Sequence, residues 1–206
     1  LQNEILRQAR KPDPGVKADA KRKADDLINR IQNYPPLAAM ALNPLLLTMI
    51  ATVHDNRGAL PGSRVELYDE ICDVLLVRRQ EAKGLTETIE LKAAQKQSVL
   101  QTLALDLMMR ERREFCLETG SEVIAHALKA VAGEMVSPTA FLKHIQNVSG
   151  LLVEREENSY QFAHLSFQEY LAAAQTKEIR KEDCLINHLE NSWWHETIRL
   201  YAANND

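Results

Sequence analysis

In residues 151–174, LLVEREENSYQFAHLSFQEYLAAA, the spacing of the hydrophobic residues changes once, from the alternation of a strand to the period of a helix. This change constrains the fold more than any other feature of the chain. Leu151 and Val153 alternate with polar neighbours, and Tyr160 and Phe162 alternate again after a Glu-Asn turn, which predicts a β-hairpin. A helical pattern follows directly. Because helical patterns also precede the hairpin, the order of elements is that of a winged-helix domain.

Almost all of the remaining sequence is predicted to be helical. Within 34–54, YPPLAAMALNPLLLTMIATVH, two short buried helices are expected, and Asn43 is a natural N-cap for the second. Pro44 suits the first helical position, where its missing N–H is not needed. Further helix starts are expected at Val16, after Ser63 in S-x-x-E spacing, near Glu90, at Ser121 and at Ser137–Pro138.

The predicted fold class is therefore mostly α, a helical bundle followed by a winged-helix domain with one small β-hairpin. We expect residues 1–15 to be the tail of a preceding domain and a turn, and residues 16–89 to be a first helical domain. The winged-helix domain is expected over residues 90–178, and a second helical domain is expected to start within 179–206.

Composition narrows the functional class. The formal net charge is −4, so no excess of basic residues indicates nucleic acid or an acidic membrane as a partner. The sequence has no apolar run long enough for a membrane span, and its three cysteines form no CxxC pair. These features favour a soluble cytoplasmic protein with reduced, incidental thiols. The six histidines are scattered and match no metal-binding motif, so no metal site is predicted.

His164 lies at the junction between the hairpin and the last predicted helix, which Ser166 and Glu169 open in the spacing of a capping box. The free N–H groups of a helix N-terminus attract anions, and phosphate above all. An imidazole beside them is a candidate phosphate ligand. The alternative is a capping or core histidine that is satisfied by a backbone carbonyl, and the spacing alone does not decide between the two.

Two motifs resemble the NACHT-family NTPases, which belong to the STAND class and include the NOD-like receptors. The stretch FAHLSFQEYLAA, residues 162–173, resembles the motif that closes the winged-helix domain of that family. LAAMALNPLLLTMIATVH and LPGSRVELYDEICDVLL are similar to its first helical domain. The motifs follow the family order, and the resemblance covers roughly residues 24–200.

The resemblance implies a regulatory role. In that family the histidine of the first motif contacts the β-phosphate of ADP and holds a closed, inactive state, and the matching residue is His164. The proline of the second motif packs against adenine, and the matching residue is Pro44. The implied function is a segment that clamps over ADP or ATP held by an upstream nucleotide-binding core and controls a closed-to-open oligomerisation switch, in bacterial defence or signalling.

No catalytic residue is predicted. The chain has no G-x-x-x-x-G-K-[ST] loop, and it has no strand ending in paired acidic residues for magnesium. Phosphoryl transfer depends on both elements. We therefore expect no ATPase activity and little nucleotide binding from this segment alone. By resemblance, its partners are the upstream core of the same chain, a C-terminal sensor domain and further copies of itself.

Two other functions remain open. Winged-helix domains often bind DNA, but residues 98–176 hold six Lys/Arg against ten Asp/Glu, and the wing turn EREEN is acidic. A winged-helix transcriptional regulator is therefore the alternative function. Trp193 and Trp194 could instead mark a protein-interaction module, although SWWHETIRL also fits the start of a further helical domain.

Overall fold

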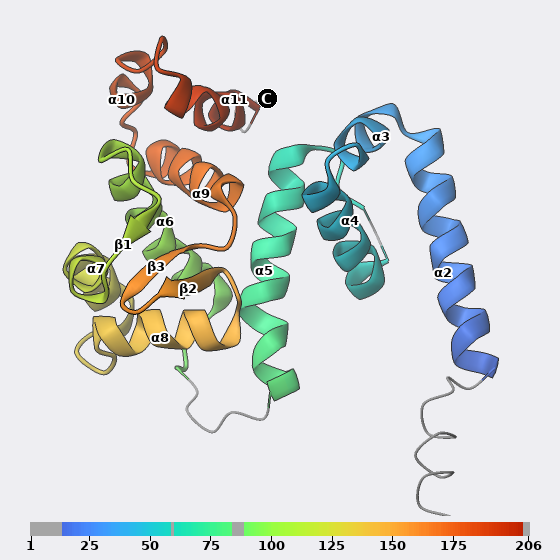
Figure 1. Ribbon diagram of the computed structural model, residues 1–206, viewed down its shortest axis with the longest axis horizontal. Helices are drawn as coiled ribbons and strands as arrows, with labels where there is room; N and C mark the ends of the chain where they lie inside the picture. The colour runs from blue at the N-terminus through green and yellow to red at the C-terminus, as the bar shows by residue number, and fades with distance from the viewer. Residues whose placement is uncertain (1–13, 59, 84–88, 204–206) are drawn as a thin grey trace, which may run out of the picture. The chain divides into compact units, whose positions relative to one another are not determined.

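A computed structural model describes residues 14–58, 60–83 and 89–203 (Figure 1). The chain divides into two compact units, Leu1–Ser63 and Arg64–Asp206. Most of the tail and turn expected over residues 1–15 lies outside the described residues. A mostly helical chain with one small antiparallel sheet agrees with the predicted fold class.

The first unit consists of three helices, α2 Pro14–Asn33, α3 Pro35–Ala41 and α4 Pro44–Arg57. The Asn43 side chain accepts hydrogen bonds from the amides of Leu45 (2.9 Å) and Leu46 (3.4 Å), so the predicted N-cap of α4 is confirmed. Pro44 occupies the first helical position as expected. α4 ends at Gly58, whose φ of +69° favours a residue without a Cβ.

The second unit contains the remaining elements. Its helices and strands, in chain order, are α5 Arg64–Lys83, α6 Ala93–Met109, β1 Glu114–Phe115, α7 Leu117–Ala132, α8 Pro138–Val148, β2 Leu152–Glu156, β3 Ser159–Phe162, α9 Leu165–Glu178, α10 Asp183–Ile186, the 3₁₀-helix η1 Ser192–Trp194 and α11 His195–Ala203. The run from α6 to β3 has the order of a winged-helix domain, as the sequence predicts (Figure 1).

The sheet has three strands in the order β1-β3-β2, all antiparallel. The hairpin of β2 and β3 is confirmed, and Leu152 pairs with Phe162 in its register. β1 was not predicted, because it is two residues long and a period cannot be recognised over two residues. Glu114 and Phe115 of β1 pair with Gln161 and Tyr160 of β3, which places β1 beside the strand that leads to His164.

Helix α9 packs along α6 in the centre of the second unit, and α11 packs on α9. The face of α9 towards the core is apolar, with Phe167, Leu171 and Ala172 buried. On α5, Tyr68 stacks on Tyr170 with ring centroids 5.4 Å apart. The aromatic contacts fix α9 against α5 and α6, so the helix start that follows β3 is held by a rigid core.

Three predicted helix starts are wrong, by two, one and four residues. α2 begins at Pro14 rather than Val16. α9 begins at Leu165 rather than Ser166, because His164 itself caps the helix. α7 begins at Leu117 rather than Ser121. The chain turns into α7 directly after β1, so the pairing of β1 with β3 sets this start, and the sequence pattern around Gly120 concealed it.

The compact units and the expected domains differ in extent. Along the chain, the boundary between the units lies between Ser63 and Arg64. The sequence analysis instead expects the first helical domain to continue to residue 89. Helix α5 packs with α6, α8, α9 and α11 of the second unit. The boundary between the domains at residues 89 and 90 stays a prediction.

Gly120 allows α7 to pass close to β1. A Cβ built at this position would lie 2.5 and 2.6 Å from two atoms of the Phe115 ring. Gly120→Ala should therefore lower the free energy of unfolding by ~1–3 kcal/mol through overpacking, although alanine favours helix elsewhere. Denaturant unfolding followed by tryptophan fluorescence measures the change, since both tryptophans lie in the second unit.

The matched control for Gly120 is a cycle with Phe115→Leu, which removes the clashing ring. The double variant should lose less stability than the two single variants together. Strict additivity of the two losses would contradict a contact between Gly120 and Phe115.

Candidate functional site

His164 is the N-cap of α9, with extended backbone angles φ −145° and ψ 143°. Its Nδ1 accepts a hydrogen bond from the Ser166 amide at 3.2 Å and lies 3.1 Å from the Ser166 hydroxyl. The imidazole thus takes the role that Ser166 was predicted to have, and the expected capping box of Ser166 and Glu169 is wrong. Histidine can replace the usual serine here because its ring nitrogen reaches the second amide of the helix.

The cap determines the tautomer of His164. Since Nδ1 accepts from an N–H group, it carries no proton in the neutral ring, and the proton is on Nε2. The hydrogen bonds of the ring to described residues are both made through Nδ1. Because the His164 side chain is exposed, its Nε2–H is available as a donor to a ligand. Capping and ligand binding, which the sequence analysis treats as alternatives, are therefore compatible.

The helix amides contribute less to an anion site than the sequence suggested. The Ser166 amide is bonded to His164 Nδ1, and the Phe167 amide donates to the His164 carbonyl at 3.0 Å. Two of the first three amides of α9 are thus already satisfied by His164. The imidazole replaces these amides as the donor that faces outwards.

A pocket of about 350 Å³ opens beside His164. Its lining comes from the loop before β1, from β2, from β3 and from the start of α9: Arg113, Arg155, Gln161, Phe162, Ala163, His164, Leu165 and Gln168. Gln168 is buried and donates to the Arg112 carbonyl at 2.9 Å, which fixes the loop carrying Arg113 to α9. The polar part of the lining is basic or neutral.

The sequence analysis missed Arg113 and Arg155. It did not consider Arg113, and it included Arg155 only within the acidic wing turn EREEN. The residues lie 42 positions apart, and only the sheet brings them to one pocket. Their basic character was the one available signal, and the surrounding glutamates obscured it.

Two carboxylates, Glu169 of α9 and Glu196 of α11, interact electrostatically. Glu169 is buried, and burial together with the nearby Glu196 raises its pKa to about 7, while Arg113 and Arg64 act in the opposite direction. Arg64 of α5 forms a 2.6 Å ion pair with Glu196 of α11. These charges connect α9, the helix that His164 caps, to α5 and α11.

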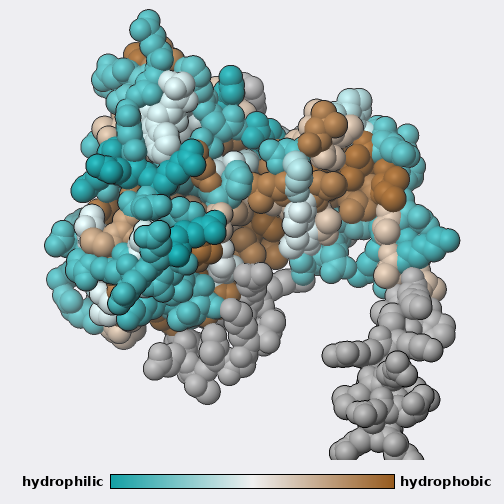
Figure 2. Space-filling model, in the orientation of Figure 1, coloured by the Kyte–Doolittle hydropathy of each residue, from teal (hydrophilic) through white to brown (hydrophobic). Residues whose placement is uncertain are grey.

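Pro44 lies in the first unit on an exposed surface. The side chains of Leu42 and Leu47 flank it and are 87% and 40% exposed. Leu47 lies one turn along α4 from Pro44 and so shares its face. Figure 2 shows apolar side chains gathered on the surface of this unit. Nucleic acids and metal ions bind to charged side chains. This apolar surface therefore suits a flat, uncharged ligand better than either of them.

A larger pocket of about 580 Å³ lies between α6, β1 and α7. One of its cations, Arg110, forms an ion pair with Asp106 at 2.8 Å. Its Cys116 thiol lies 3.1 Å from the Thr119 hydroxyl. Among the described residues no cluster of His, Cys, Asp and Glu could hold a metal ion, and no helix is long and apolar enough to cross a bilayer.

The comparisons with known proteins agree with the fold. Residues 64–176, more than half of the chain, match the family model described as the winged helix-turn-helix domain C-terminal to NACHT. No curated protein matches the sequence. The matched residues begin with α5 and end within α9, so they include His164 and its pocket.

The raised pKa of Glu169 predicts a pH-dependent stability. The folded protein binds the Glu169 proton more tightly than the unfolded chain, so the free energy of unfolding should fall as pH rises from about 4.5 to about 7. Glu169→Gln should remove this fall. At pH 8 it should be more stable than wild type by ~1–2 kcal/mol, after allowance for solvent screening, and at pH 4.5 nearly equal.

Unfolding in urea at pH 4.5, 6 and 8 measures this difference. Glu122→Gln, an exposed position on α7, controls for the change in net charge. A stability gain for Glu169→Gln that is the same at every pH would contradict the assignment.

Proposed function

The chain belongs to the family of winged helix-turn-helix domains C-terminal to NACHT, and on this premise we propose that it closes over ADP or ATP held by an upstream nucleotide-binding core. It is then a regulatory segment and not a catalyst. The missing phosphate loop and magnesium carboxylates belong to the core, and the segment adds contacts to the nucleotide from the other side.

One observation carries the proposal. The Ser166 amide occupies His164 Nδ1 and so leaves Nε2–H as the exposed donor at the mouth of a basic pocket. A hydrogen bond from this donor to a phosphate oxygen is assisted by the charge of the phosphate. The hydrophobic side chains that pack around α9 hold the His164 donor in place, which lowers the entropy lost when a ligand binds.

Pro44 supplies the second contact of the proposal. Its ring is rigid, and Asn43 fixes its backbone by capping α4. With Leu42 and Leu47 it offers an exposed apolar surface against which an adenine ring can pack.

The proposed clamp acts as a switch through differential binding. ADP shifts the equilibrium towards the closed state only by the contacts that it makes in that state and lacks in the open one. One hydrogen bond to a charged phosphate contributes ~1.5–3 kcal/mol, or about 10- to 100-fold in the closed-to-open ratio. Exchange for ATP, coupled to a C-terminal sensor, would open the clamp and permit oligomerisation, in bacterial defence or signalling.

The test is made in the protein that carries both this segment and its nucleotide-binding core. His164→Asn keeps a good N-cap, but its Nδ2–H group lies nearer the backbone than the imidazole Nε2–H and does not reach the same position, whereas His164→Ala loses both the cap and the donor. Both variants should release ADP about tenfold faster or more, and both should oligomerise more readily without a trigger. Stopped-flow release of a fluorescent ADP analogue and size-exclusion chromatography measure the two effects.

The matched control is His126→Ala, an exposed histidine on α7, which should release ADP as wild type does. Wild-type ADP release from His164→Asn would contradict the phosphate contact. Faster release from His164→Ala alone would assign the effect to the lost cap.

The 206-residue chain by itself should not hydrolyse ATP, because phosphoryl transfer needs the phosphate loop and metal that the sequence lacks. A coupled phosphate-release assay with ATP and Mg²⁺ measures this. ATP turnover that survives repurification and disappears on a point substitution in this chain would overturn the regulatory assignment.

A further inference from the structure

The pocket of about 580 Å³ between α6, β1 and α7 shares no lining residue with the pocket of His164. Its volume lies within the range of pockets that hold small organic ligands. The deep part of its lining is apolar, because Leu103, Leu107 and Phe115 are buried there. An apolar group that enters this pocket therefore loses its contact with water, which favours binding.

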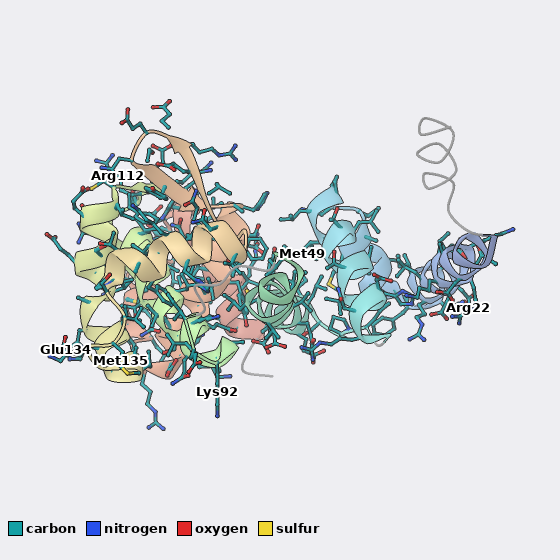
Figure 3. All side chains as sticks on the ribbon, turned by 90° about the horizontal axis from the view of Figure 1, so that it is seen from below. Arg22, Met49, Lys92, Arg112, Glu134 and Met135 are labelled. Atoms are coloured by element: carbon teal, nitrogen blue, oxygen red, sulfur yellow. The ribbon has the colours of Figure 1, made fainter. Side chains whose placement is uncertain are left out.

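The charged side chains of the lining are balanced in sign. Asp106 and Arg110 form an ion pair at 2.8 Å, so their charges largely cancel. Arg112 and Glu114 remain, and both are exposed at the mouth of the pocket; Figure 3 shows Arg112 at the surface of this unit. In the described part of the chain neither belongs to an ion pair, and Glu114 Oε2 accepts a hydrogen bond from the neutral Ser159 hydroxyl at 3.3 Å. One guanidinium and one carboxylate are thus available to groups of opposite charge.

The segment that carries Arg112 and Glu114 is fixed before a ligand binds. The Arg112 amide donates to the Leu107 carbonyl at 2.9 Å, and the Arg112 carbonyl accepts from Gln168 Nε2 at 2.9 Å. Glu114 is held by the pairing of β1 with β3. Arg113, the residue between them, lines the other pocket instead. Binding of a ligand to the two charges therefore costs little backbone entropy.

A ligand of one charge alone does not suit this mouth. An anion bound by Arg112 would be repelled by Glu114, and a cation bound by Glu114 would be repelled by Arg112. The Cα atoms of residues two positions apart lie at most about 7 Å from each other, so one small ligand can reach both side chains. A molecule with a carboxylate, an ammonium group and an apolar body matches all three parts of the lining.

We propose that this pocket binds a small zwitterion with apolar side chains, the chemistry that apolar amino acids share with short apolar peptides. The carboxylate of the ligand lies against Arg112, its ammonium group against Glu114 and its side chains against the buried apolar residues. The volume favours a short peptide over a single amino acid. The site goes beyond the proposed function, since it shares no residue with the phosphate contact.

Cys116 provides the readout, because its half-buried thiol lines this pocket. The 206-residue chain is modified with N-ethylmaleimide while dileucine is titrated, and mass spectrometry follows each cysteine. We expect saturating dileucine to slow the modification of Cys116 by about fivefold or more, since only the unoccupied pocket exposes the thiol. Cys184, which is half-buried outside the pocket, should react at an unchanged rate and serves as the control within the same molecule.

Variants and blocked ligands assign each end of the ligand to its residue. In isothermal calorimetry, Arg112→Gln and Glu114→Gln should each weaken dileucine binding by about tenfold or more, the effect of one charge-assisted hydrogen bond. Dileucine amide lacks the carboxylate and should bind Arg112→Gln no more weakly than wild type. N-acetyl-dileucine lacks the ammonium group and should bind Glu114→Gln no more weakly than wild type.

Arg180→Gln and Glu122→Gln are the matched controls, because both positions are exposed and lie outside the lining. Each should bind dileucine within about twofold of wild type. Diglycine carries the same charges without the apolar body and should bind about tenfold more weakly than dileucine, or weaker still.

Leucine and trileucine measure the size of ligand that the pocket accepts. Saturable binding of either one that depends on Arg112 and Glu114 also supports the zwitterion and assigns its source. The inference would be overturned by a Cys116 thiol that no leucine ligand protects. Diglycine binding as tight as that of dileucine, or dileucine binding that is unchanged in both variants, would overturn it as well.

Discussion

The hydrogen bond from the Ser166 amide to His164 Nδ1 determines the chemistry of this site. It ends the hairpin, begins α9 and chooses the tautomer of the imidazole in a single contact. Had serine capped the helix, as the sequence suggested, the histidine could have turned either nitrogen towards solvent. As it is, the fold presents an N–H donor outwards, and the stability of α9 and the readiness of the donor depend on the same bond.

The packing of α9 gives this bond its rigidity. α9 lies between α6, α5 and α11, with an aromatic stack to Tyr68 on one side and the Glu169, Glu196 and Arg64 charges on another. A site on an unsupported loop would lose more entropy on binding. The arrangement also places His164 at the start of the helix on which α11 packs, so a change at the pocket has a short path to α11.

The distribution of charged side chains in this winged-helix domain differs from the distribution that binding to duplex DNA needs. Two of its cations, Arg113 and Arg155, line one pocket, while its wing turn is acidic and its third helix, α8, has a single lysine. Concentrated charge favours a compact anion such as a diphosphate, and spread charge favours a polymer. Few basic side chains are therefore available for the phosphates of duplex DNA.

The sequence by itself determined the helices, the hairpin, the Asn43–Pro44 start of α4 and the place of His164 at a helix start, because hydrophobic period and capping residues act over a few positions. It could not determine the strand β1 or the start of α7, since both depend on β3, which is distant in the chain. It also did not identify the cap of α9, because His164 and Ser166 are only two residues apart and the spacing alone fits either residue as the cap. Only the tertiary structure decided that Arg113 and Arg155 share a pocket with His164. The reason is that β-sheet pairing joins residues far apart in sequence, and no local pattern records which ones.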